Sequence, residues 1–220
     1  MRQAAPLVLA IALAPAVLVR SGGADDALLV RASPAPAPCV QAAGRAWEAS
    51  GGRPLSVEPG GLRDPGRWDV LVGASVELTR ALEGGGAASD SDVDVALIPW
   101  VLSVAPGSSV RGLEDVARSG VEATVLGGDA AYEARRVLAE HGIGRFRESS
   151  DAARLRSAAV ALVPISLAGS GEHIGVDVPP IRVGAAVGAR SGHPDDAAAF
   201  VRYLASTAGQ QAFAACASAQ

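Results

Sequence analysis

Side chains suited to catalysis or metal binding are few in this sequence and lie far apart. The three histidines, His141, His173 and His193, are scattered among predicted turns. None of the common motifs for a nucleophile, a zinc site, a redox pair or a dinucleotide (G-x-S-x-G, H-E-x-x-H, C-x-x-C, G-x-G-x-x-G) occurs. A metal site would require His141 and His173, from distant segments, to converge with an adjacent glutamate. We therefore expect surface histidines and a protein that is not an enzyme and needs no cofactor or metal.

The two cysteines, Cys39 and Cys216, are separated by most of the chain. Zinc ligands usually come in close pairs, so this spacing is unlike that of a metal site. In an oxidising compartment the two residues can form a disulfide if the C-terminus folds back beside the first helix. The alternative is a pair of buried or free thiols, and the sequence leaves both open.

Composition and charge exclude several reactions and partners. The chain has 220 residues, 49% of them hydrophobic, which is enough for one or two domains. All 19 basic residues are arginine, and chemistry that requires lysine, such as Schiff-base formation or a P-loop, is therefore excluded. The formal net charge is −4, without a basic cluster of the kind that binds nucleic acid. We expect no nucleic-acid partner.

The N-terminal residues 1–24 have the pattern of a secretory signal peptide. Met1 and Arg2 begin a positive region, an apolar run covers 6–19, and small residues follow Arg20. The run is too short to span the ~30 Å hydrocarbon core comfortably, and cleavage after Ala24 fits the small-residue exit. A membrane anchor is the alternative. We expect a mature periplasmic protein in which no later segment crosses a membrane.

Short apolar runs alternate with segments of helical spacing along the rest of the chain. The runs predict strands at 27–32, 55–57, 68–72, 121–126, 158–163 and 181–187, and a longer apolar segment at 93–105 is interrupted by Pro99. Helical spacing predicts helices at 39–50, 76–82, 113–118, 130–141, 195–204 and 209–216. This alternation predicts an α/β architecture with mostly parallel sheets.

The last two predicted helices carry the most specific pattern in the chain. Their segments 192–197, 200–206 and 209–213 resemble the closing helices of bacterial periplasmic substrate-binding proteins of ABC transporters (type II fold). Pro194 suits the first turn of a helix, and Phe200, Tyr203 and Leu204 share one apolar face. Further segments are similar to the same family in order along the chain: 28–33, 68–72, 100–107, 113–116 and 159–164. The order and spacing are nearest the molybdate-binding branch.

This resemblance implies two α/β lobes joined by a two-strand hinge, with the ligand in the cleft between them. Residues 25–102 and 188–220 would form lobe one, and residues 103–187 would form lobe two. Ligand would contact both lobes in the closed state only, so that binding shifts a hinge equilibrium. The closed form of a monomer would then be presented to an ABC permease in the membrane.

The resemblance also implies ligand contacts at turns that follow strands, where backbone N–H groups and hydroxyls bind oxyanions. Ser33 matches a ligand-binding serine of the molybdate branch. The other candidate ligand-binding residues are Gly60, Gly61, Gly73, Ser75, Asp129, Ala130 and Ser166. Gly60 and Gly61 fall where the branch has a serine, and Pro164 stands at a tyrosine position. Because glycine and proline bring no side-chain donor, two expected donors are missing.

Structural roles are the alternatives for several of these residues. Ser33 would be a turn residue, and Ser75 and Asp129 would be helix N-caps. Tyr132 is expected to pack on its own helix. The expected function is delivery of a small ligand, an inorganic oxyanion such as molybdate or tungstate, to an ABC permease. The alternative is a degenerate binding-protein scaffold that acts through a protein partner without transporting a small ligand.

Overall fold

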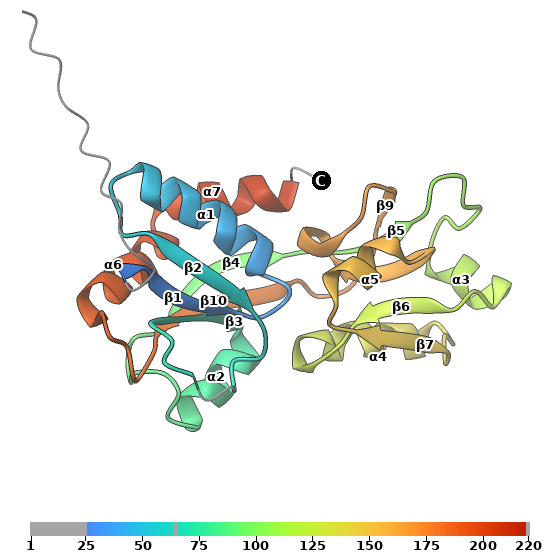
Figure 1. Cartoon of the computed structure of the whole chain (residues 1–220). Coiled ribbons are helices and arrows are strands. Elements are labelled where there is room, and N and C mark those ends of the chain that lie inside the picture. The colour runs from blue at the N-terminus through green and yellow to red at the C-terminus, as the bar shows by residue number, and fades with distance from the viewer. Residues whose placement is uncertain (1–25, 64–65, 219–220) are drawn as a thin grey trace, which may run out of the picture.

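Two five-stranded sheets, one in each of two lobes, organise the chain (Figure 1). The computed structural model describes residues 26–63 and 66–218. The predicted signal peptide lies outside these residues. Within the described residues, no helix has the length and apolar character needed to cross a membrane.

The sheet of the first lobe has the strand order β2-β1-β3-β10-β4. Its strands are β1 (Leu28–Ala32), β2 (Leu55–Pro59), β3 (Val70–Ala74), β4 (Val93–Ile98) and β10 (Ile181–Val187). Strand β1 pairs in parallel with β2 and β3, whereas β10 is antiparallel to both β3 and β4. The parallel strands come from the N-terminal part of the chain, and β10 returns from the second lobe.

Helices cover both faces of this sheet. They are α1 (Ala37–Ala49), α2 (Ser75–Glu83), α6 (Pro194–Ala205) and α7 (Thr207–Ser218). Figure 1 shows α1 and α7 on one side of the sheet and α2 on the other. Because side chains alternate along a strand, Val70 and Val72 of β3 pack in the large core while Leu71 packs with Leu78 of α2. Burial on both faces explains why β3 reads as a continuous apolar run.

The sheet of the second lobe has the order β7-β6-β8-β5-β9. Its strands are β5 (Trp100–Val104), β6 (Ala123–Leu126), β7 (Phe146–Ser149), β8 (Val160–Pro164) and β9 (Glu172–Gly175). Its helices are α3 (Leu113–Ser119), α4 (Tyr132–Glu140) and α5 (Ala152–Ser157), with 3₁₀ turns η2 (Asp129–Ala131) and η3 (Ile165–Leu167). Strand β6 is parallel to β7 and β8, and β5 is antiparallel to β8 and β9. The predicted two-lobed α/β fold is confirmed, with parallel and antiparallel pairs in each sheet.

The chain passes between the lobes twice, at Pro99 and at residues 176–180. Proline cannot donate to a strand ladder, and here it separates β4 in the first sheet from β5 in the second. The sheets thus divide the chain after Pro99 and before Ile181, whereas the sequence-based boundaries were placed at 102 and 187. The difference arises because β5 belongs entirely to the second sheet and β10 entirely to the first. The sheet that a strand joins is decided by its pairing partners, which local composition does not reveal.

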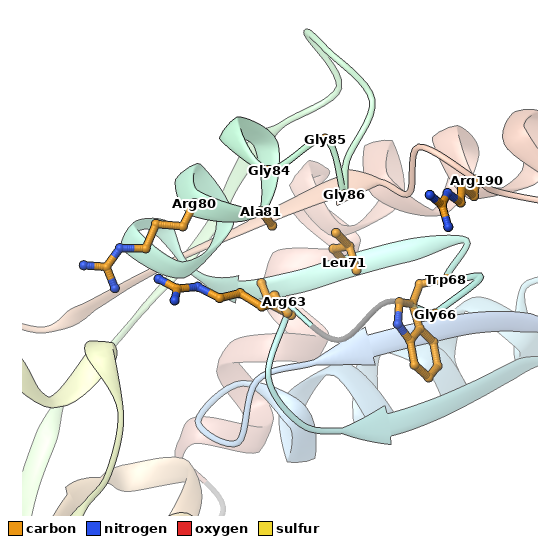
Figure 2. Close-up of a pocket in the computed structure, with 11 residues that line it drawn as sticks. Arg63, Gly66, Trp68, Leu71, Arg80, Ala81, Gly84, Gly85, Gly86 and Arg190 are labelled. Carbon is orange, nitrogen blue, oxygen red and sulfur yellow. The ribbon is translucent and has the colours of Figure 1, made fainter.

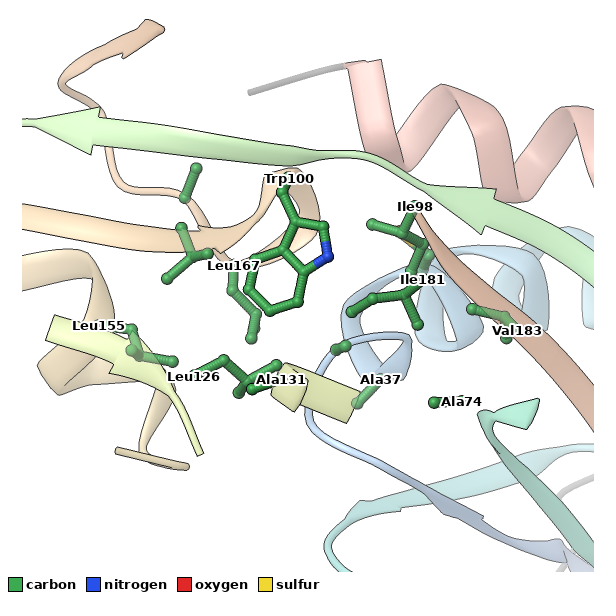
Figure 3. Close-up of a cluster of buried hydrophobic side chains, with 14 of the residues drawn as sticks. Ala37, Ala74, Ile98, Trp100, Leu126, Ala131, Leu155, Leu167, Ile181 and Val183 are labelled. Atoms are coloured by element: carbon green, nitrogen blue, oxygen red, sulfur yellow. The ribbon is translucent and has the colours of Figure 1, made fainter. Parts of the chain in front are cut away.

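An apolar cluster fills the interior where the lobes meet. Trp100, at the start of β5, lies near Ile98 at the end of β4 and Ile181 at the start of β10 (Figure 3). Ala37 of the first lobe and Ala131 of the second belong to the same cluster. These side chains are buried. The two lobes therefore share one continuous hydrophobic core next to the two points where the chain crosses between them.

The structure joins Cys39 of α1 to Cys216 of α7 in a disulfide, with their Cα atoms 5.2 Å apart. The C-terminal helix does lie beside the first helix (Figure 1). Of the two alternatives that the sequence left open, the structure shows the bond.

Candidate functional site

Ser33 lies at the end of β1, where the first lobe faces the second. Its N–H donates to the carbonyl of Val72 at 2.8 Å, and its own carbonyl accepts from Ala37 N–H at 3.1 Å. The residue is only 1% exposed, and its hydroxyl makes no hydrogen bond of standard geometry within the described residues. A buried hydroxyl without such a bond is a candidate for contact with a ligand.

The carboxylate of Glu77, a residue that was not among the predicted site residues, lies beside Ser33. Glu77 Oε2 accepts from the N–H of Ala74 at 3.2 Å. Both Glu77 Oε2 and Ser33 Oγ lie 3.2 Å from the point where a Cβ on Gly73 would be, so a side chain at that position would crowd both. The sequence did contain a signal for Glu77. It lies three residues after Ala74, and a glutamate at this spacing often caps the start of a helix by accepting a hydrogen bond from the N-cap N–H.

The environment of Glu77 disfavours its charged form. Burial raises the pKa of Glu77, while the facing Ser33 hydroxyl and the Ala74 N–H act in the opposite direction. The net effect is a pKa above the usual range. In its ionised form, Glu77 opposes a fully ionised oxyanion at this position, because like charges repel strongly where water is excluded.

The first turn of α1 offers few donors for an anion. Pro34, Pro36 and Pro38 have no N–H, and the N–H of Ala37 is already bonded to Ser33. Helix N-termini bind anions through just these N–H groups. Three prolines therefore weaken the anion site that a helix start would otherwise provide.

Ser166, a predicted ligand donor, instead joins the two lobes. It is fully buried at 0% exposure, and its hydroxyl donates to the carbonyl of Ala35 at 2.6 Å. Ser166 lies in η3 of the second lobe, and Ala35 precedes α1 in the first. In the structure its hydroxyl proton is therefore engaged by the protein itself.

Replacing Ser166 with alanine should weaken the contact between the lobes. The Ala35 carbonyl is left without this donor inside the protein, so we expect a loss of about 1–3 kcal/mol in the free energy of unfolding. Urea denaturation of Ser166→Ala would measure it, with the exposed Ser170→Ala as the matched control. Equal midpoints for the two variants would show that the Ser166 bond contributes nothing.

Asp129 forms the second polar link between the lobes. It pairs with Arg80 of α2, and Arg63 lies 3.8 Å away. The hydrogen bond from Arg80 is the main reason why the pKa of Asp129 is lowered, although burial opposes it. The N-cap alternative for Asp129 is wrong, because η2 begins without a side-chain cap and the carboxylate reaches across to the first lobe.

The remaining predicted residues separate into two groups. The N–H of Gly60 donates to Ala32 at 2.8 Å, and the Gly61 carbonyl accepts from Arg31 Nε at 3.2 Å, so this turn packs on an arginine side chain. Ser75 does not cap α2, because its hydroxyl donates to the carbonyl of Arg182 at 3.2 Å. Ser75 thus links the start of α2 to β10 within the first lobe.

A cavity of about 410 Å³ lies between the lobes and brings three of the predicted residues together. Ser75, Asp129 and Ala130 line it, whereas Ser33, Gly60, Gly61, Gly73 and Ser166 do not. The walls come from the start of α2, from η2 with the start of α4, and from residues 179–182, where the crossing segment 176–180 runs into β10. A molecule in this cavity would contact both lobes and the hinge at once.

Tyr132, expected to pack on its own helix, is 64% exposed and lines this cavity. The sequence-based expectation was wrong because Tyr132 is the first residue of α4. A side chain at the start of an α-helix has no preceding α-helical turn to lie on, and the short 3₁₀ turn η2 before it leaves Tyr132 exposed.

A second cavity, of about 420 Å³, is lined by residues of the first lobe. Figure 2 shows Arg63 and Arg80 at one end, Trp68 and Arg190 at the other, and the loop with Gly84 to Gly86 above. None of the predicted ligand-binding residues lines it. Among residues 26–63 and 66–218, no group of three or more His, Cys, Asp or Glu side chains is placed to hold a metal ion.

Comparison with solved structures finds the same arrangement of lobes in several proteins. The periplasmic molybdate-binding protein of Azotobacter vinelandii superposes with a TM-score of 0.73 at 15% identity, over 86% of this chain and 97% of that one. The sulfate-binding protein of Mycobacterium tuberculosis gives 0.70 at 16% identity, over 87% and 85%. PEB3 from Campylobacter jejuni, bound to L-phospholactate, gives 0.64 at 15% identity, over 86% and 97%. No protein-family model and no curated protein sequence matches this chain.

Proposed function

Because the chain has the two-lobed type II fold of periplasmic binding proteins, we propose that it is an extracytoplasmic solute-binding protein. It closes over a small anion and delivers it to an ABC permease in the membrane. One observation carries this proposal: the cavity between the lobes is walled by both lobes and by the crossing segment. Ligand in that cavity favours the closed arrangement, since only there are all the contacts made.

The charge of the ligand follows from the side chains around the cavity. Arg80, Arg135 and Arg182 line it together with Asp129 and Glu133, which leaves one net positive charge. The structural neighbours bind molybdate, sulfate and phospholactate according to their descriptions, and all three ligands are anions. We therefore propose a small anion, with molybdate and tungstate as the oxyanions to be tested first. Delivery of such a ligand is binding and release, so no chemical step is required of the protein.

A thermal-unfolding series with molybdate, tungstate, sulfate, phosphate, phospholactate and small carboxylates tests the proposal. Ligand at about 100 times its Kd should add about 2.7 kcal/mol to the stability of the folded state. The control is sodium chloride at the same ionic strength, because screening alone changes the strength of surface ion pairs. If no anion raises the unfolding temperature above this control, the transport proposal is wrong.

A specific set of contacts favours a second candidate, a scaffold that acts through a protein partner without a small ligand. The Ser166–Ala35 hydrogen bond and the Arg80–Asp129 ion pair join the two lobes through groups of the protein itself. Glu77 meanwhile lies beside the predicted donor Ser33. If this candidate is correct, solution X-ray scattering will give the same radius of gyration with and without each anion. A ligand-dependent compaction would exclude it.

A further inference from the structure

The cavity between the lobes has apolar walls that a bare oxyanion would leave uncovered. Val76, on α2 of the first lobe, is 42% exposed, and Tyr132, on α4 of the second, is 64% exposed. Both line this cavity, as do Pro179 and Pro180 of the crossing segment. Exposed hydrophobic groups on opposite walls of one cleft indicate a binding surface for an apolar group.

Most charged side chains around the cavity already have partners. Arg80 pairs with Asp129, Arg135 with Glu148, and Glu133 with Arg136. Arg182 differs, because it forms no ion pair with any carboxylate in the part of the chain that the structure describes. It is exposed and lines the cavity. The site therefore has one arginine available for a single anionic group.

Arg182 is held next to the start of α2. Its carbonyl accepts the Ser75 hydroxyl at 3.2 Å, and its neighbour Val183 is paired with Ala74 in the antiparallel ladder between β10 and β3. The N-terminal end of a helix carries partial positive charge. Arginine and helix end together define where the anionic group of a ligand would lie.

The size of the cavity agrees with an organic ligand. Its volume of about 410 Å³ falls within the ~300–1,000 Å³ typical of pockets for small organic molecules, which are mostly apolar with a few polar groups. The turn at Ser33, by contrast, holds the Glu77 carboxylate and three prolines and is poorly suited to an ionised oxyanion.

These observations point to a ligand class, and we infer that the protein binds an organic monocarboxylate with a compact apolar body in this cavity. Its carboxylate pairs with Arg182 beside the start of α2, and its apolar body lies between Val76 and Tyr132. This inference rests on the proposed function and narrows it. It keeps the ligand in the cavity beside residues 179–182, away from the Ser33 turn that the sequence had suggested.

Calorimetric titration with phenylacetate and isovalerate, and with molybdate and phosphate for comparison, tests the inference. We expect the two carboxylates to bind the wild type, and both Arg182→Gln and Tyr132→Ala to weaken them at least tenfold. All these side chains are exposed, so the variants should fold. The matched controls Arg202→Gln and Val121→Ala change exposed side chains outside the cavity and should bind as the wild type does.

The other outcomes are distinguishable. If molybdate or phosphate binds and depends on Ser33→Ala or Glu77→Gln but not on Tyr132→Ala, the monocarboxylate inference is overturned and the transport proposal stands. If the carboxylates bind with equal affinity to Arg182→Gln, the inference is likewise overturned. If no anion of either kind binds the wild type, the inference and the transport proposal both fail.

Discussion

Replacing Cys39 and Cys216 together with alanine should lower the free energy of unfolding by about 2–5 kcal/mol, the range found for native disulfides. The bond closes a loop with a sequence separation of 177 residues, and a cross-link over a long loop removes much of the conformational entropy of the unfolded chain. Guanidinium denaturation of the double variant and the oxidised wild type gives the difference. Alanine is preferred to serine because Cys39 is completely buried and a hydroxyl there would lack a partner.

The reduced wild type is the control for this variant. It has the same core atoms without the bond, so its stability should lie near that of the double variant. A mass increase of about two daltons on reduction follows from adding two hydrogens to the bond. If the variant and the oxidised wild type unfold at the same denaturant concentration, the disulfide does not stabilise the fold.

Asp69→Asn should lower the free energy of unfolding by about 3 kcal/mol, because Asp69 is a buried carboxylate that is hydrogen-bonded to two distant segments. It accepts hydrogen bonds from Leu29 N–H at 2.9 Å, Ser191 Oγ at 2.6 Å, Gly192 N–H at 2.9 Å and His193 N–H at 3.2 Å. The residue is 3% exposed. An asparagine can accept only at one oxygen, and its amide group would face N–H donors. Urea denaturation at neutral pH measures the loss.

The same carboxylate predicts a pH dependence. Burial opposes ionisation of Asp69, but the four hydrogen bonds outweigh it, and its pKa is lowered. For a group with a lowered folded-state pKa, the stabilisation is complete above the unfolded pKa of about 4 and is lost as pH falls through the folded value. We therefore expect the wild type to lose stability below pH ~4 more steeply than Asp69→Asn. The exposed Asp92→Asn is the matched control and should follow the wild type. Parallel curves for Asp69→Asn and the wild type would contradict the assignment.

Local sequence was sufficient to predict most of the elements. The strand at 181–187 has the bounds of β10, since Pro179 and Pro180 precede it and Gly188 follows. Pro99 separated the long apolar segment into two strands, as a residue without an N–H should. Strands β7 and β9 were missed because they lie at the edges of their sheet, and their residues are largely exposed and polar.

The sequence by itself thus determined the α/β class and the order of most strands and helices, because hydrophobic periodicity reports which face of an element is buried. It did not predict β7, α5 or β9. Only the tertiary structure decided what the candidate site contains. The Ser166 bond joins residues 131 positions apart. Glu77 lies beside Ser33 at Gly73 of β3, and Val76 and Tyr132 line one cavity from opposite lobes. Such contacts depend on which turns the sheets bring together, and no local pattern encodes that pairing.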